Sequence, residues 1–487
     1  MRRAYKIFGA NGQNSGRELD SDFQYDRKEE KRKDEEGLMA PMTKILATLG
    51  VAVLFGAMNG CAAPAPGPEP AAAPTSPTGF DGEIARYGQR MLEEGRMTFR
   101  FDTFGSEAFW GDALQLHRAI AGEKNGGVGP GVSPKTALSI GLKVDADALP
   151  DALKQQLTRG EVNLDDPATT IALLKLNAVV GVTGFTNPDG SVKSMGIQCA
   201  FCHSTVDDSF APGIGKRLDG WPNRDLNVGA IVSLAPNLKP FTDLLGVDVE
   251  TVKKVLVSWG PGRYDAELDK DGKGFRPDGK QAGTLIPPAF GLAGVNLSTW
   301  TGFGSVPYWN AYVAGTQMHG AATFVDSRFN NKNQYPISAR TGSGNTRNVS
   351  DRATAKLAAL HFYQLSIPAP KAPAGSFDQA GFDRGKILFD GAAKCASCHV
   401  PPLYTEPGQN LHTPSEIGID SFQADRSPTH MYRTAPLAGL WAHQKGGFFH
   451  DGRFATLLDV VNHYDAHFKL NLSEANKRDL VEYLKGI

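Results

Sequence analysis

Cysteine, long apolar runs and an excess of one charge are what this sequence lacks. It has five cysteines in 487 residues. Four of them fall in two Cys-x-x-Cys-His strings, a pattern that excludes a disulfide framework. No run of about eighteen apolar residues occurs, so nothing in the sequence predicts a membrane-spanning helix. The 51 basic and 52 acidic side chains nearly balance, which argues against nucleic acid or an anionic membrane face as the main partner.

Glycine and proline are plentiful by contrast. The chain has 55 Gly and 31 Pro, more than a helical bundle needs, so we expect long ordered loops. Because 41% of the residues are hydrophobic and 21% are charged, the chain can bury real cores. Its length predicts two or three domains.

Residues 1–60 are predicted to be a leader followed by a secretory signal peptide. Residues 1–38 carry a dense mixture of charges that cannot bury enough apolar surface to order itself. After a basic start at 42–44 come thirteen mostly apolar residues, 45–57, as in a signal peptide. Signal peptides normally begin a chain, so we expect translation to start at Met39 or Met42.

Cys61, the odd cysteine, follows Asn59-Gly60 where the signal should be cleaved. A small residue before Cys resembles the lipobox of bacterial lipoproteins, although Met58 departs from the usual leucine. Residues 61–78 form a Pro/Ala-rich tether that should be extended and solvated. We expect a lipid anchor at Cys61 that holds the protein on the periplasmic side of a Gram-negative envelope. The alternative is that Cys61 is removed with the signal.

Two haem attachment strings, 199–203 and 395–399, carry the clearest chemistry. In each, two thiols add to the vinyl groups of one haem, and the next imidazole ligates the iron. A zinc half-site or a redox dithiol is the competing interpretation, but no further cysteines complete a zinc site. The sequence therefore predicts two covalently bound haem c groups. They would be attached at Cys199, Cys202, Cys395 and Cys398 and ligated by His203 and His399.

The segments around the strings predict a mainly α fold with two cytochrome c-like haem domains. In residues 372–487, Ser376 is expected to cap a helix over 377–389, and Ser473 a terminal helix over 473–487. The N-terminal haem domain, 79–371, is expected to contain a helix over 83–100. It should also contain a small β-hairpin, 179–185 with 191–197, and long loops over 260–345 that wall the first haem.

The order of the C-terminal blocks resembles the bacterial di-haem cytochrome c peroxidase superfamily. These blocks are R-T-x-x-L at 433–437, F-H-D-G at 449–452 and T-L at 456–457. The resemblance implies that one haem reacts with peroxide or O₂ while the other relays electrons, supplied by a donor protein. It also implies a Ca²⁺ ion between the domains. Residues 265–278 are weakly similar to a calcium-binding loop but lack its required spacing of acidic residues, so we expect a solvated turn there.

The N-terminal half is similar to the di-haem rubber oxygenase branch. The similarity lies in residues 220–225 and in the pair Trp309 and Phe324, which in that branch flank the open face of the first haem. His319 is a weaker candidate for a distal acid–base group. Trp309 and Phe324 could equally be core aromatics. The chain lacks the branch's long insertion before the last helix, which argues against a polymer substrate.

The sixth ligand of the second haem should come from the region before the terminal helix. His463 is the first choice because it matches the branch's distal histidine, with Met431 and His467 as alternatives. Arg433 and His450 are expected to hydrogen-bond the second haem's propionates or to brace its loop. The sequence thus predicts a peroxidase-like oxidoreductase. The alternatives are an oxygenase acting on a hydrophobic substrate and an electron carrier without catalysis.

Overall fold

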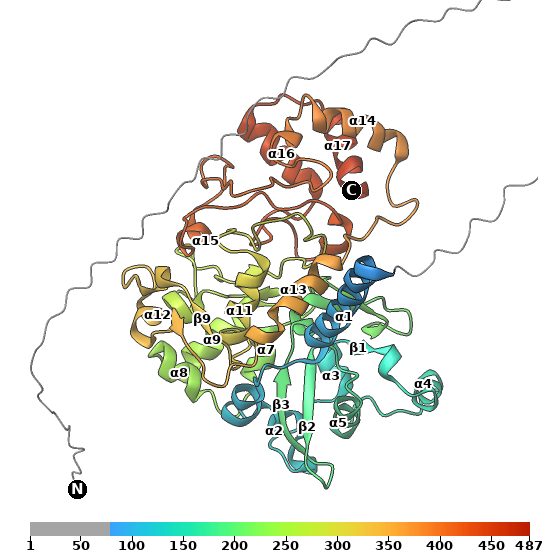
Figure 1. Cartoon of the computed structure of the whole chain (residues 1–487), viewed down its shortest axis with the longest axis vertical. Coiled ribbons are helices and arrows are strands. Elements are labelled where there is room, and N and C mark those ends of the chain that lie inside the picture. Colours follow the sequence, from blue (N-terminus) through green and yellow to red (C-terminus); the bar gives the residue numbers. More distant parts are fainter. Residues whose placement is uncertain (1–77) are drawn as a thin grey trace, which may run out of the picture. The chain divides into compact units, whose positions relative to one another are not determined.

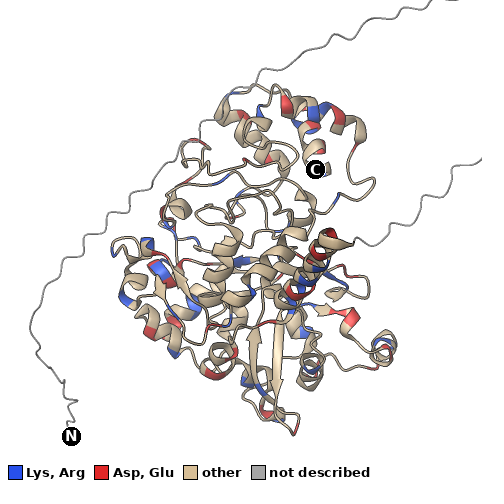
Figure 2. Cartoon of the chain, viewed as in Figure 1, with Lys and Arg blue, Asp and Glu red and all other residues tan. Residues whose placement is uncertain are grey.

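The computed structural model describes residues 78–487. The leader, the signal peptide, Cys61 and the tether to residue 77 lie outside the described residues. The described chain is mainly helical, with five small two-stranded sheets. None of its helices combines the length and apolar character needed to cross a membrane. Basic and acidic side chains are interspersed along it (Figure 2).

The helices vary greatly in length (Figure 1). They are α1 Gly79–Phe101, α2 Leu116–Ala121, α3 Pro134–Ser139, α4 Asp151–Thr158, α5 Pro167–Lys175, α6 Ala200–His203, α7 Val228–Ser233, α8 Lys239–Leu245, α9 Val249–Trp259, α10 Leu268–Asp271, α11 Val306–Gly315, α12 Pro336–Thr341, α13 Leu357–Ser366, α14 Gln379–Asp390, α15 Phe422–Asp425, α16 Leu457–Phe468 and α17 Glu474–Gly486. The strands are β1 Val144–Asp145, β2 Val182–Thr186, β3 Val192–Ile197, β4 Ser204–Val206, β5 Ile214–Gly215, β6 Arg217–Asp219, β7 Arg263–Tyr264, β8 Thr284–Leu285, β9 Phe324–Val325 and β10 Asn345–Thr346.

The N-terminal helix α1 confirms the helix predicted over 83–100 and packs along α13 (Figure 1). The two helices approach closely at Gly95. A Cβ built there would lie 2.0 Å from the carbonyl oxygen of Ala359, so only glycine fits without moving a helix. Met91, Thr98 and Phe99 of α1 are buried on either side of this point.

Helices α14 and α17 form a second close pair (Figure 1). Ser473 caps α17 by accepting a hydrogen bond from the Asn476 amide, as predicted. The predicted cap of α14 is wrong. Asp378 accepts from the Gly381 amide at 2.7 Å, whereas the Ser376 hydroxyl donates to the Pro373 carbonyl. A carboxylate at the first turn also interacts favourably with the helix dipole.

The predicted β-hairpin is confirmed in β2 and β3. The strands pair antiparallel with Val182 opposite Ile197, and β3 ends two residues before Cys199. Leu174 of α5 lies against Gly184, where a Cβ would come within 3.1 Å of it. The hairpin therefore leads directly into the first haem string, and α5 packs against it.

The stretch 260–345 is mostly loop, as predicted, but it also contains three short helices that the sequence did not predict, α10, α11 and α12, of which α11 is the longest. Apolar residues occupy all faces of α11, so no amphipathic stripe marks it in the sequence. It contributes to an aromatic core whose buried members are Phe303, Trp309, Tyr312, Phe324, Phe329 and Tyr335. The division into domains 79–371 and 372–487 stays a prediction. Its expected boundary lies between the end of α13 and the start of α14.

Candidate haem attachment sites

The two Cys-x-x-Cys-His strings each form a short helical turn, α-helical in the first and 3₁₀ in the second. The His203 amide donates to the Cys199 carbonyl at 3.2 Å, and the His399 amide donates to the Cys395 carbonyl at 2.9 Å. Within residues 78–487, none of the four cysteines is in a disulfide. Because residues three or four apart in a helical turn share a face, each string can present both thiols and the imidazole to one flat group.

The thiols lie in surroundings that keep them protonated. Burial raises the pKa of Cys199 and Cys202 to about 12 and that of Cys395 to about 11. The pKa of Cys398 is also raised by burial. Redox dithiols and zinc sites need thiolates, which cationic surroundings favour and apolar surroundings oppose. These pockets therefore suit thiols that become thioethers to an apolar macrocycle.

Both imidazoles are neutral at pH 7, the form that ligates iron. Burial lowers the pKa of His399, and its Nδ1 is hydrogen-bonded to the Tyr404 carbonyl oxygen at 3.0 Å. That bond fixes the ring and leaves Nε2 for a metal. Burial lowers the pKa of His203 to about 4, opposed by the nearby Pro287 carbonyl. The His203 Nδ1 is buried and completes no hydrogen bond within the described chain. Both donor sets fit a c-type haem.

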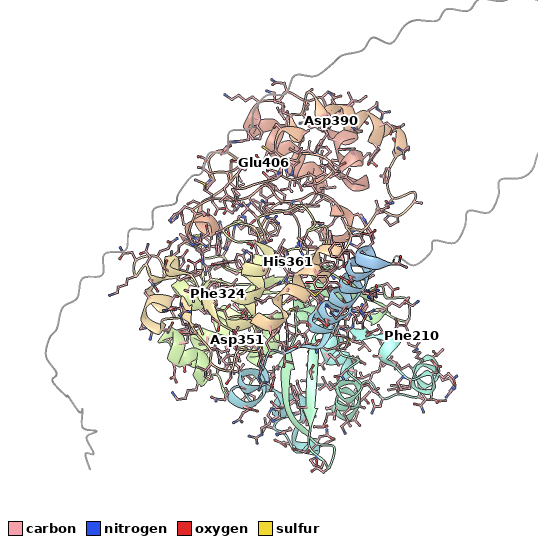
Figure 3. All side chains as sticks on the ribbon, in the orientation of Figure 1. Phe210, Phe324, Asp351, His361, Asp390 and Glu406 are labelled. Atoms are coloured by element: carbon pink, nitrogen blue, oxygen red, sulfur yellow. The ribbon has the colours of Figure 1, made fainter. Side chains whose placement is uncertain are left out.

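His319 and Phe324 line one cavity of about 270 Å³. The His319 ring lies flat on Phe109, with ring centroids 3.6 Å apart. Phe324, labelled in Figure 3, begins β9. Trp309 does not line this cavity; its ring contacts Tyr312, which in turn contacts Phe324 within the aromatic core that all three share. The structure thus brings two of the three predicted distal residues together and sets Trp309 behind them.

Charged groups surround His319. Burial, and secondly the charge of Lys270, lower the pKa of His319 to about 3. The Lys270 ammonium is fully buried and pairs with Asp269 at 3.0 Å. It also lies 5.1 Å from the Tyr312 ring centroid. His319 is therefore a neutral imidazole that can accept a hydrogen bond or a proton in this cavity.

Near the second string, the predicted sixth ligands differ in their surroundings. The His463 Nε2 is hydrogen-bonded with the Ile417 carbonyl at 3.0 Å, and the His467 Nε2 with the Glu416 carbonyl at 3.0 Å. Met431 is half-buried in the loop before the R-T-x-x-L block. Tyr464 of α16, not singled out from the sequence, lies close enough to the string's thiols to feel their charge. Burial, then the charges of Cys398 and Cys395, raise its pKa. The choice of sixth ligand stays a prediction.

Arg433 braces a loop. Its Nη1 donates to the Leu297 carbonyl at 2.6 Å, and its Nε donates to the Thr299 carbonyl. His450 is buried, and its ring stacks on Tyr432 at 5.1 Å. Its Nε2 has no hydrogen-bond partner among the residues that the structure describes. The roles expected for Arg433 and His450 at the second haem stay predictions.

The segment 265–278 is not the solvated turn expected from its sequence. Asp265, Glu267 and Asp271 are buried around Arg426, whose guanidinium pairs with Asp265 at 2.8 Å and Asp271 at 2.7 Å. Burial raises the pKa of Asp265 to about 6 and that of Glu267 to about 7, although Arg426 opposes both shifts. The error arose because Arg426 lies 155 residues away from Asp271.

The buried carboxylates of 265–271 do not form an evident site for the expected calcium ion. Arg426 already supplies the countercharge to the buried carboxylates. In a second acidic group, Asp420 and Asp451 lie close to His450. There, Arg453 pairs with both carboxylates. Calcium therefore stays a prediction.

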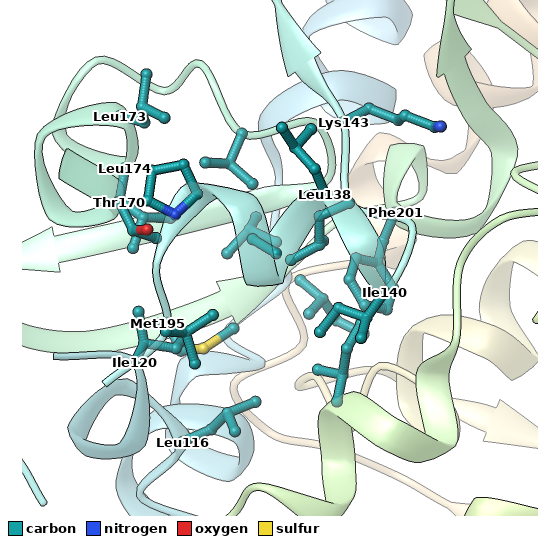
Figure 4. Close-up of a pocket in the computed structure, with 18 of the residues that line it drawn as sticks. Leu116, Ile120, Leu138, Ile140, Lys143, Thr170, Leu173, Leu174, Met195 and Phe201 are labelled. Carbon is teal, nitrogen blue, oxygen red and sulfur yellow. The ribbon is translucent and has the colours of Figure 1, made fainter. Parts of the chain in front are cut away.

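An apolar cavity of about 50 Å³ lies beside Phe201, inside the first string (Figure 4). Leu138, Ile140, Leu174 and Met195 also line it. A volume of this order holds one or two water-sized molecules. The cavity is large enough for a diatomic gas and far too small for a hydrophobic polymer.

Comparison with known proteins gives partial matches. No family model matches the chain. It is 30% identical over 154 residues to methylamine utilization protein MauG of Methylorubrum extorquens, a match that covers 27% of this chain and 43% of MauG. The match thus spans less than half the length of this curated relative.

Two solved structures are also similar at 16% identity. Hydrazine synthase of Kuenenia stuttgartiensis, pressurized with xenon, gives a TM-score of 0.27 over 42% of this chain and 73% of that chain. A MauG-like protein associated with microbial copper homeostasis gives 0.29 over 43% of this chain and 75% of that chain. These TM-scores are too low to establish a fold shared with either structure.

Two helical turns, each with partly buried thiols and a neutral imidazole, are typical of a c-type cytochrome. The weak homology to MauG, a protein of the di-haem cytochrome c peroxidase family, supports the resemblance of this chain to that superfamily.

Proposed function

We propose that this chain is a di-haem c-type oxidoreductase of the peroxidase type. The observation that carries the proposal is the repeated turn at 199–203 and 395–399, with the same His-amide to Cys-carbonyl hydrogen bond in both. When bound, the haem at the first string supplies the reaction with peroxide or O₂, and the haem at the second supplies electrons. In this proposal an exogenous protein or small molecule is the electron donor.

The cavity beside His319 and Phe324 is lined by residues from 109–346, the part of the chain that also carries the first string, and this supports assigning the reactive role to that string. It has room for a small oxidant, at about 270 Å³, and its walls combine an aromatic ring with a neutral imidazole. A neutral imidazole can take a proton from an oxidant and return it to the leaving oxygen. Lys270 and Asp269 line the same cavity, and Lys270 places a positive charge near the imidazole.

Paired cysteine variants test the proposal. The full chain would be produced with a cytochrome c maturation system, and covalent haem counted by mass and by pyridine haemochrome. We expect two haems in the wild type, and one each in C199A/C202A and C395A/C398A. Peroxide-dependent oxidation of a dye should disappear in the first variant and slow in the second. A wild type without covalent haem would overturn the proposal. So would full activity in C199A/C202A.

A further inference from the structure

Two arginines near the first haem string lack an anionic partner of their own. Arg224 is 6% exposed. Its Nη1 reaches only the Lys445 carbonyl, at 3.3 Å. Arg263 donates to the Asp451 and Pro261 carbonyls at 3.4 and 3.5 Å. The Nε atoms of both arginines are buried with no hydrogen-bond partner in the described chain. Buried guanidinium groups are normally paired, so this arrangement needs an explanation.

The backbone ties both arginines to the first string. Asn223, just before Arg224, donates its amide to the Cys202 carbonyl at 2.9 Å. Gly262, just before Arg263, accepts a hydrogen bond at 2.9 Å from the Ile286 amide. Ile286 precedes Pro287, whose carbonyl faces the His203 ring. The backbone that carries both arginines is therefore anchored beside the first string.

The opposite wall comes from the segment 443–453. The Leu285 amide donates to the His450 carbonyl at 2.7 Å, which joins the two walls. His443 and His450 are buried, and the Nε2 atom of each is unpartnered within residues 78–487. Two arginine and two histidine nitrogens without acceptors thus lie where residues 220–290 meet residues 443–453. The two arginine nitrogens can only donate, and each neutral histidine nitrogen can donate in one of its tautomers, so a negatively charged acceptor would satisfy all four.

The nearby carboxylates do not fill this role. Asp451 pairs with Arg453 at 2.8 Å and with Arg276 at 3.4 Å. Asp225 pairs with Lys143 at 2.7 Å and also with Lys445. In the absence of an anion, burial and the charge of Arg263 lower the pKa of Arg224 to about 10. The two guanidinium groups repel each other, as expected of a site arranged around an anion.

We infer that Arg224 and Arg263 hold the propionate carboxylates of the haem attached at Cys199 and Cys202. This inference rests on the proposed function, because it takes that haem as bound. A haem brings two carboxylates to a fixed place relative to its thioether bonds, which matches two fixed guanidinium groups. Arg433 is a weaker holder, since carbonyl oxygens already accept hydrogen bonds from its Nε and Nη1.

Redox titration of the holoprotein tests the inference. R224Q and R263Q each remove one positive charge beside the propionates, and the uncompensated carboxylates then stabilise ferric iron. We expect the ferric–ferrous equilibrium of the first haem to shift about tenfold toward ferric, equal to ~59 mV for one electron. The second haem should shift less than about twofold. R263K, which keeps the charge, should restore most of the potential.

Arg217 offers a matched control. It is a buried arginine near the same string, and Asp145 pairs with it at 2.7 Å. R217Q should therefore lower thermal stability and leave the first haem's potential within about twofold.

Three results would overturn the inference. One is an unchanged first-haem potential in R224Q and R263Q alike. Another is a shift confined to the second haem. The third is a wild-type potential that moves with added phosphate, which would mean that a free anion occupies the site. Covalent haem counted in the same samples separates this inference from the proposed function. Absence of haem from the wild type removes the function, whereas two haems with unmoved potentials remove only the inference.

Discussion

Each of the two haem strings lies near a pair of helices that cross at a glycine, but the surroundings of the two strings differ. Near the first string, α1 crosses α13 at Gly95, where an added Cβ would lie 2.0 Å from the Ala359 carbonyl oxygen. Near the second string, α14 crosses α17 at Gly385, where an added Cβ would lie 2.1 Å from the Asp479 carbonyl oxygen. The intervening chain is what differs. In the second region the string begins at Cys395, directly after α14 ends at Asp390, whereas Phe101 and Cys199 enclose the hairpin and several helices.

This difference reaches the iron-binding side chains. The His399 ring is fixed by the Tyr404 carbonyl, and the second string is partly exposed at Ser397. The first string packs against a larger apolar core, in which Ala200 and Phe201 are buried. A similar helix crossing is therefore followed closely by the haem string in the second region. In the first region it is followed by a larger set of helices and loops that contains a cavity with room for a small oxidant. Under the proposed function, the compact second region would serve electron relay and the larger first region the reaction with the oxidant.

The largest expected effect comes from the crossing glycines. G95A and G385A each place a methyl group against a backbone carbonyl, and we expect each to lower the free energy of unfolding by about 3 kcal/mol. Thermal and urea unfolding would measure the loss. Gly88 of α1 is the control, because a Cβ there meets only Phe362 at 3.8 Å. G88A should be neutral or stabilising by up to about 1 kcal/mol. Equal stability of G95A and G88A would remove the parallel between the two regions.

His319 gives the largest expected kinetic effect. If its imidazole moves the proton during the reaction of the oxidant, H319A should slow that step about 100-fold, and H319Q should not restore it. Stopped-flow mixing with peroxide would measure the rate, and the haem count confirms loading. The burial-lowered pKa of about 3 keeps His319 neutral above pH 4. The rate should therefore show no histidine titration between pH 5 and 8. A rate that is unchanged in H319A would exclude this role.

Glu267 gives a smaller effect on stability with a definite sign. Its pKa is raised to about 7 by burial, so the folded protein binds its proton more tightly than the unfolded chain does. The stabilisation from this proton is complete below the unfolded pKa of about 4.3 and is lost as pH rises through 7. E267Q should match the wild type near pH 4.5. It should exceed the wild type by about 2 kcal/mol at pH 8, as measured by urea unfolding. A pH-independent difference would contradict the shift.

Trp309 and Phe324 separate the cavity wall from the core behind it. Phe324 lines the cavity and Trp309 lies in the aromatic core. F324A should change the rate with bulky or apolar oxidants several-fold, while W309F should chiefly cost stability, about 1 kcal/mol. Paired stopped-flow and unfolding measurements check this. A larger rate effect for W309F than for F324A would favour the open-face role expected from the resemblance.

The sequence predicted those elements whose signals are local. Both haem strings, the hairpin, α1 and the Ser473 cap follow from spacing, alternation or a capping residue. The failures need long-range contacts. No local pattern in residues 265–271 predicts that their carboxylates are buried around Arg426. Likewise, no local pattern in residues 443–453 predicts that this segment packs against the segment of Arg263. α11 is apolar on all faces, and it is a helix because the surrounding aromatic core buries it.

The central claim is that one haem has an open face beside His319 while the other does not. Electron paramagnetic resonance of the oxidised holoprotein tests it, repeated after addition of peroxide and of imidazole. We predict one high-spin and one low-spin ferric signal, with the high-spin signal lost from C199A/C202A and shifted by either addition. Two low-spin signals that neither ligand moves, before and after one-electron reduction, would contradict the claim and leave an electron carrier.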